Sequence, residues 1–158
     1  MIIDLVWLGA VPPTLEWTAG KILQTERTVQ GVCTAIQLGL DQTAADAFFF
    51  WDEANHVLPH LETLKDLLSK PDDLWHAGLS LGTSGKPGLL DFVAPTWMFN
   101  CDSAPQISAT SWRVSLNACL VRTELIRQIG FLNPAFTTLD AAALEWGHRC
   151  IQRGVCCR

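Results

Sequence analysis

Residues 47–53, AFFFWDE, decide the fold that this sequence predicts. Five apolar residues in a row, with no polar side chain between them, are typical of a strand that is buried on both faces. The run stops abruptly at Asp52 and Glu53. Ligands of α/β proteins lie beyond the carboxyl ends of parallel strands, so acids at this end of a buried strand indicate a binding site. The stretch therefore predicts an α/β fold with a site where the strand ends.

Strand-like runs and helix-like periodicity alternate on both sides of this segment. The pattern predicts strands over residues 2–8, 75–81 and 112–121, and a strand with an irregular loop within residues 89–105. It predicts helices over residues 15–24, 28–40, 57–69, 122–130 and 140–153. No linker or repeat interrupts this order, so residues 1–158 are expected to form one domain. We expect a three-layer, Rossmann-like fold, with a mainly parallel sheet flanked by helices.

The composition excludes several classes of partner. The net charge is −5, and the lysines and arginines form no cluster, which argues against nucleic-acid binding. The apolar runs are shorter than a bilayer span, so no transmembrane segment is expected. The N-terminus has no basic region before its apolar stretch and no small-residue cleavage site. We therefore expect a cytoplasmic protein whose six cysteines are reduced thiols.

Three segments, in this order, resemble the family-2 glycosyltransferases of the GT-A type. The first is residues 46–59 (DAFFFWDEANHVLP), which resembles the strand of that family that ends in a D-x-D motif. The second is residues 115–136 (SLNACLVRTELIRQIGFLNPAF), which carries most of the similarity. The third is residues 144–154 (LEWGHRCIQRG), which resembles the family's helix with an arginine and a final glycine. Together they cover about half of the chain, so the resemblance implies a GT-A-like fold of reduced size.

The resemblance implies a reaction and a set of residues. The family transfers a sugar from a nucleotide-sugar donor to a hydroxyl acceptor, such as a glycan. Asp52 matches the first acid of D-x-D, which implies contact with the donor and with a divalent cation, Mn²⁺ or Mg²⁺, that neutralises the diphosphate. Glu53 and Trp97 are further candidates for contact with the nucleotide-sugar. Asp140 or Glu145 would be the base that takes the acceptor's proton.

The sequence also departs from the family's pattern. Ala54 stands at the second acid of D-x-D, and residues 142–143 are both alanine where the family has an acidic pair. Only about 40 residues, predicted to be mostly helical, separate the first strand from Asp52, where the family usually has two more strands. These departures leave open a second interpretation, a non-catalytic GT-A-like domain that binds a ligand or a partner. Trp146, together with Trp97, is a candidate for the wall of a ligand site.

Overall fold

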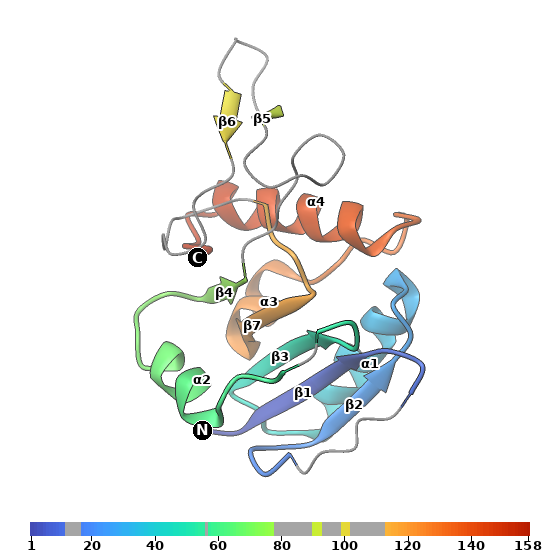
Figure 1. The fold of residues 1–158 in the computed structure, drawn as a ribbon, viewed down its shortest axis with the longest axis vertical. Coiled ribbons are helices and arrows are strands. Elements are labelled where there is room, and N and C mark those ends of the chain that lie inside the picture. The colour runs from blue at the N-terminus through green and yellow to red at the C-terminus, as the bar shows by residue number, and fades with distance from the viewer. Residues whose placement is uncertain (12–16, 56, 78–89, 93–98, 102–112) are drawn as a thin grey trace.

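The computed structural model describes residues 1–11, 17–55, 57–77, 90–92, 99–101 and 113–158 of the chain. A five-stranded sheet forms its middle layer (Figure 1). The strands lie in the order β2 (Ile22–Thr25), β1 (Ile3–Leu8), β3 (Ala47–Asp52), β7 (Ala118–Arg122) and β4 (Leu74–His76). β1 pairs in parallel with β2 and β3, whereas β7 runs antiparallel to β3 and to β4. The predicted α/β class is confirmed, and the sheet is mostly but not purely parallel because β7 opposes its neighbours.

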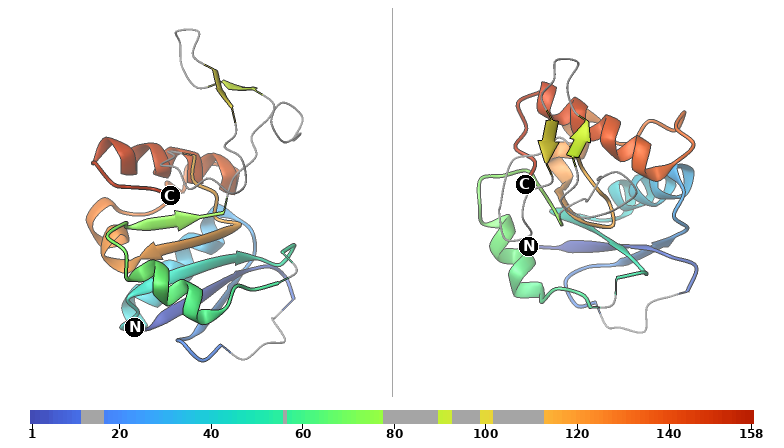
Figure 2. Two further views of the ribbon diagram at one scale, coloured as in Figure 1. Left: turned by 60° about the vertical axis from the view of Figure 1, so that its left-hand side comes forward. Right: turned by 45° about the horizontal axis from the view of Figure 1, so that its top comes forward.

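Helices cover both faces of this sheet (Figure 2). They are α1 (Val29–Gln42), α2 (Leu61–Leu68), α3 (Thr123–Ile129) and α4 (Leu139–Gln152). The side chains of β3 alternate between two apolar cores, as the pleat of a strand requires. Phe48 and Phe50 pack in a core with residues of α1, α3 and α4, whereas Phe49 and Trp51 pack in a second core with residues of α2. Because both faces are covered, β3 is buried along its whole length, as its apolar run predicts.

The ends of the helices follow from capping residues. Thr28 and Thr138 have extended backbones, and their hydroxyl oxygens accept hydrogen bonds from the first turns of α1 and α4. At the other end, Gly130 follows α3 with a φ of 77°, a conformation that glycine adopts without steric cost. The helices predicted over residues 28–40, 122–130 and 140–153 are confirmed, with ends that differ by one or two residues.

The prediction of a helix over residues 15–24 is wrong. The described part of this range contains no helix, and it runs into strand β2. Ile22 and Leu23 pair with Leu5 and Val6 of β1, and Leu23 is buried in the core. Pairing with a buried strand outweighs the helical spacing of a short segment, because strand preference depends mainly on tertiary context. In the described part of the chain between β1 and β3, there are therefore one strand, β2, and one long helix, α1.

Three other predicted elements are shorter than expected. The helix predicted over residues 57–69 begins at Leu61, and its proline lies before the first turn instead of within it. The strand predicted over residues 112–121 begins only at Ala118, because the chain bends at residues 116–117, and residue 112 lies outside the described residues. Strand β4 ends at His76, and residues 78–81 of that prediction lie outside the described residues.

The remaining strands form a separate antiparallel pair. β5 (Leu90–Phe92) and β6 (Phe99–Cys101) lie within the region predicted to hold a strand and an irregular loop. Of the helices in the described ranges, none has the length and apolar character to cross a membrane.

Candidate functional site

The candidate site lies at the edge of the sheet where the parallel strands end. Leu8 of β1 pairs with Thr25 of β2 and with Asp52 of β3, so the carboxyl ends of these three strands lie side by side. β7 runs the other way, so Asn117, which precedes it, lies at the same edge, and the carbonyl oxygen of Asn117 accepts a hydrogen bond from the Asp52 backbone amide at 2.8 Å. Segments that are far apart in the sequence therefore meet at this edge.

One arginine joins the side chains at this edge. Nε of Arg27 donates to Oδ2 of Asp52 at 2.8 Å. Nη2 of the same guanidinium donates to Oδ1 of Asn117 at 3.0 Å and to Oδ1 of Asp140 at 2.7 Å. We call these four residues, Arg27, Asp52, Asn117 and Asp140, the Arg27 cluster. It unites the two acids that the sequence suggested from separate segments.

Each member of the cluster is positioned by the element that carries it. Asp52 continues the alternation of Phe48 and Phe50, so it points to the face of the sheet covered by α1 and α4. Its Oδ1 accepts a hydrogen bond from the Ala54 amide at 2.9 Å, which fixes the carboxylate. Arg27 immediately precedes the cap of α1, and Asp140 lies in the first turn of α4. The cluster therefore fastens two helix N-termini to the end of β3.

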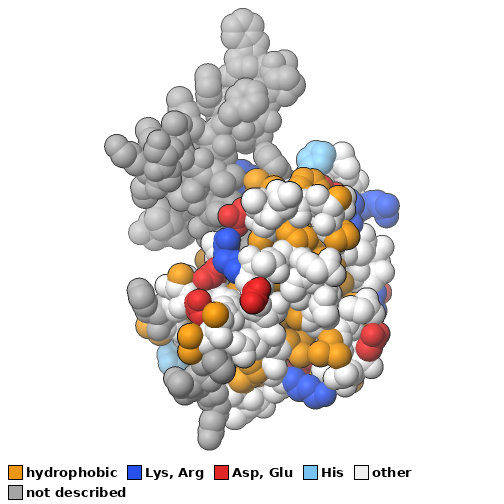
Figure 3. Space-filling model, turned by 90° about the vertical axis from the view of Figure 1, so that its right-hand side faces the viewer, with side chains coloured by type: hydrophobic (Ala, Val, Ile, Leu, Met, Phe, Trp, Pro, Cys, Tyr) orange, Lys and Arg blue, Asp and Glu red, His pale blue; other side chains and the backbone are white. Residues whose placement is uncertain are grey.

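The side chains of the cluster carry opposite charges and differ in exposure. Two carboxylates against one guanidinium leave one net negative charge. The side chain of Asp52 is only 11% exposed, whereas Arg27 is 39% and Asp140 is 56% exposed. Acidic and basic side chains lie side by side near the middle of the face shown in Figure 3, and they form no basic patch there. A ligand at this edge would meet the outer side of Arg27 and Asp140 while Asp52 stays behind them.

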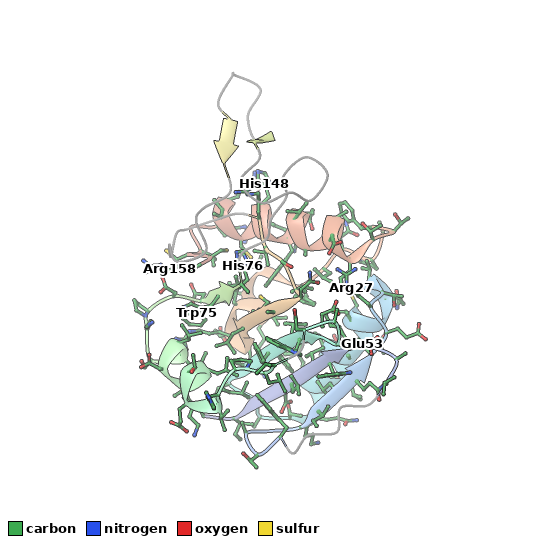
Figure 4. All side chains as sticks on the ribbon, viewed as in Figure 1. Arg27, Glu53, Trp75, His76, His148 and Arg158 are labelled. Atoms are coloured by element: carbon green, nitrogen blue, oxygen red, sulfur yellow. The ribbon has the colours of Figure 1, made fainter. Side chains whose placement is uncertain are left out.

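Glu53 lies at the same side of the molecule as Arg27 but makes different contacts (Figure 4). Its backbone amide donates to the carbonyl of Leu8, and its carboxylate is 3.4 Å from the amide of Val11. A methyl group added at Gly9 would come within 2.2 Å of Glu53 Oε2, so the carboxylate lies directly against this glycine. Glu53, which follows β3, therefore packs against the turn after β1.

Glu145 is placed in a different network from Asp140. Both of its carboxylate oxygens accept bonds from Arg149, at 2.9 and 3.0 Å. Arg149 also donates to the carbonyl oxygens of Ile129, the last residue of α3, and of Phe131, which lies just beyond that helix. Glu145 therefore holds the arginine that ties α4 to the end of α3, and the structure does not bring it into the Arg27 cluster.

Of the two tryptophans predicted to form the wall of a ligand site, the structure describes one, Trp146. Trp146 is fully buried, and its indole nitrogen donates to the carbonyl of Gly130 at 2.9 Å. The suggestion that it lines a ligand site is wrong, because an apolar face at this position of α4 turns toward the sheet. Trp97 lies outside the described residues.

Whether a divalent cation fits among the oxygens of the Arg27 cluster depends on Arg27 itself. Two carboxylate oxygens and an amide oxygen are ligands that Mg²⁺ and Mn²⁺ accept. In the Arg27 cluster, however, these three oxygens all accept bonds from the guanidinium, and the other oxygen of Asp52 accepts one from the Ala54 amide. Within the described residues, no group of three or more His, Cys, Asp or Glu side chains is arranged to hold a metal ion. The cluster does not fit a divalent cation while Arg27 holds its place.

Two residues of the cluster were not suggested by the sequence, and both omissions have a physical cause. Arg27 follows the segment that was predicted as a helix, so nothing placed it at the end of a strand. Asn117 falls within the strand predicted over residues 112–121, whereas in the structure it lies just before β7. A strand at residues 22–25 followed by the Thr28 cap would have put Arg27 at the carboxyl edge.

No protein-family model matches this chain, and no curated protein is significantly similar to it in sequence. The family therefore stays a proposal that depends on the segments quoted above and on the Arg27 cluster.

Proposed function

We propose that this chain is a glycosyltransferase-like domain of the GT-A type, which binds a nucleotide-sugar and transfers the sugar to a hydroxyl acceptor. One observation carries the proposal. Asp52, at the first acid of the D-x-D-like segment, and Asp140, one of the two candidate bases, are 88 positions apart in the sequence, yet both bind one guanidinium at the carboxyl edge of the sheet. A donor-side acid and a base are needed within one site, and this arrangement supplies such a pair.

In the proposed reaction, Asp140 is the base. Its Oδ1 is held by Arg27, and its Oδ2 has no hydrogen-bond partner among the described residues. Oδ2 would accept the proton of the acceptor hydroxyl, whose oxygen then forms a bond to the anomeric carbon of the donor. The bond from that carbon to the diphosphate breaks, and the nucleoside diphosphate leaves with the electron pair. Asp52 acts on the donor side by holding Arg27 in place, and no step depends on a metal ion.

The binding of a donor is tested by thermal melting. We expect UDP-sugars or GDP-sugars to raise the melting temperature of the wild-type protein by several degrees, because a ligand that binds only the folded state stabilises it. Asp52→Asn removes the charge that holds Arg27 and should abolish the shift. Glu124→Gln changes an exposed acid on α3 and is the matched control, which should keep it. The proposal fails if no donor shifts the melting temperature of the wild type, with or without Mn²⁺.

The role of the base is tested by turnover. Asp140→Asn should lower the rate of donor turnover by about 10²- to 10⁴-fold, the usual contribution of a general base, while donor binding persists. Equal activity of Asp140→Asn and the wild type would exclude Asp140 as the base.

A second candidate function is a non-catalytic GT-A-like binding or partner domain. It is favoured by the absence of an acid at Ala54 and by the engagement of Glu145 with Arg149. This candidate predicts a melting shift with nucleotide-sugars or with nucleoside diphosphates but no sugar release or transfer with any acceptor. The cytoplasmic location and the acceptor class stay predictions under either candidate.

A further inference from the structure

We infer that Arg27 is the permanent cation of this site, in the place of a divalent metal ion, and that its guanidinium binds the diphosphate of the ligand directly. The ligand class is a nucleoside diphosphate or its sugar ester, bound without metal. This inference rests on the proposed function for its ligand, but its statement about the cation depends only on the Arg27 cluster.

The guanidinium of Arg27 lies among the oxygens that a metal ion would need. Its nitrogens lie 2.7–3.0 Å from oxygens of Asp52, Asn117 and Asp140, so one cation already satisfies all three. A metal ion bound to the same oxygens would lie about 2.0–2.2 Å from each of them and would overlap the guanidinium. A divalent ion beside an intact guanidinium would also be repelled by it.

The guanidinium of Arg27 also has a nitrogen outside the three bonds of the cluster. Nε and Nη2 make the three bonds of the cluster, and Nη1 has no partner in the described part of the chain. The side chain is 39% exposed, so solvent reaches it. Arginine donates from a rigid fork that matches the oxygens of a phosphate, which makes Nη1 the group that an incoming diphosphate would contact.

Asp52 holds Arg27 from the buried side of the cluster. Asp52 is nearly buried, and its two oxygens are held by Arg27 and by the Ala54 amide, so it cannot turn toward solvent to bind a metal ion. The position of the second acid of the motif is an alanine. In this site the arginine itself is the cation, and Asp52 holds it in place.

The statement about the cation is tested with Mn²⁺ alone. The concentration of free Mn²⁺ is measured by its electron paramagnetic resonance signal. The wild type should leave the signal of free Mn²⁺ unchanged at equal, submillimolar concentrations of protein and ion. Arg27→Gln should reduce the signal, because the freed oxygens of Asp52, Asn117 and Asp140 can then coordinate the ion. Arg127→Gln, which changes an exposed arginine on α3, is the matched control and should behave as the wild type does.

Two results would overturn the statement about the cation. One is binding of Mn²⁺ by the wild type that is lost in Asp52→Asn. The other is a folded Arg27→Gln protein, judged by circular dichroism, that binds no Mn²⁺. If Arg27→Gln does not fold, Arg27→Lys replaces it. This variant keeps a positive charge but cannot bridge all three oxygens, and the inference predicts that it gains no more than weak Mn²⁺ binding.

The test of the ligand uses UDP and GDP in isothermal titration. Binding to the wild type should be the same in EDTA as in Mn²⁺, and Arg27→Gln should weaken it by about tenfold or more, as expected for the loss of a charged hydrogen bond. Binding that requires Mn²⁺, or that is unchanged in Arg27→Gln, overturns the inference and leaves the proposed function standing. Absence of nucleotide binding under both conditions refutes the proposed function and the ligand statement, while the Mn²⁺ experiment still decides the role of Arg27 as the cation.

Discussion

At the scale of single residues, Arg27 shows how one side chain joins distant parts of a chain. It links the end of β3, the segment before β7 and the start of α4. Hydrogen bonds with at least one charged partner are stronger than those between neutral groups, and this one guanidinium makes three such bonds, two of them to carboxylates. The partners of an arginine depend on tertiary structure, so this role could not be read from the residues around it.

Gly9 provides a test of local packing at the edge of the sheet. Gly9→Ala should lower the free energy of unfolding by about 1–3 kcal/mol, because the new methyl group would overlap the side chain of Glu53. Urea denaturation measures the change. In a Glu53→Gly background the overlapping side chain is absent, so the same substitution should cost less. An equal cost in both backgrounds would show that Glu53 is not the obstacle.

The residues of the site were predictable only in part. Asp52 was identifiable because a long apolar run makes a strand and its end evident. Asp140 was suggested by the family resemblance, at the start of the helix predicted over residues 140–153. Their common partner was not, since nothing local in the sequence pairs an arginine with acids that follow it by 25 and 113 positions.

At the scale of elements, the helices with caps and amphipathic spacing were predicted well, and the short strands were not. α1 and α4 carry both a threonine cap and a regular apolar face, which are local signals. β2 has only four residues, and its conformation is set by pairing with β1. Pairing is a property of two segments at once, which explains why these bounds were missed.

The cap of α1 gives a prediction with a matched control. Thr28→Ala should lower the free energy of unfolding by about 1 kcal/mol, because the Gly31 amide loses its acceptor. Thr34→Ala lies on the exposed side of the same helix and should change stability by no more than about 0.5 kcal/mol. Chemical denaturation of both variants compares them, and similar losses would contradict the capping role.

The junction of α3 and α4 depends on Arg149. Arg149→Lys keeps the charge but loses the fork that donates to two carbonyl oxygens and to Glu145. We expect a loss of about 1.5–3 kcal/mol in the free energy of unfolding, since hydrogen bonds from a charged group are removed. Arg153→Lys, at the exposed end of α4, is the control and should have little effect. A loss as large in the control would indicate a general effect of lysine on this helix.

At the scale of the whole molecule, a histidine on the edge strand β4 makes the stability of the protein depend on pH. His76 lies at its end, near Trp75 and Arg158 (Figure 4). Burial lowers the pKa of His76 from its ordinary value of 6.5, the carbonyl of Ala77 partly offsets this, and Arg113 lowers it further. Nε2 is buried without a hydrogen-bond partner in the described structure, so the folded state favours the neutral ring.

The sign of this effect follows from proton uptake. Below about pH 6.5 the unfolded chain binds a proton at His76 more readily than the folded chain does, so the free energy of unfolding falls as the pH is lowered. The loss should be absent in His76→Gln. Urea denaturation of both proteins between about pH 7.5 and 5 measures the difference. A gap between them that does not change with pH would contradict the lowered pKa.

The position of β7 between β3 and β4 has a consequence for how the chain folds. Phe49 pairs with Leu120, a partner 71 positions later, whereas β1, β2 and α1 are close in the sequence. Proteins dominated by such non-local pairing fold slowly, because a long loop must close before any contact is gained. Two of the three residues that bind the guanidinium, Asn117 and Asp140, belong to the later part of the chain. The first half alone therefore cannot assemble the site, and during synthesis the guanidinium acquires its full set of partners only after β7 has inserted.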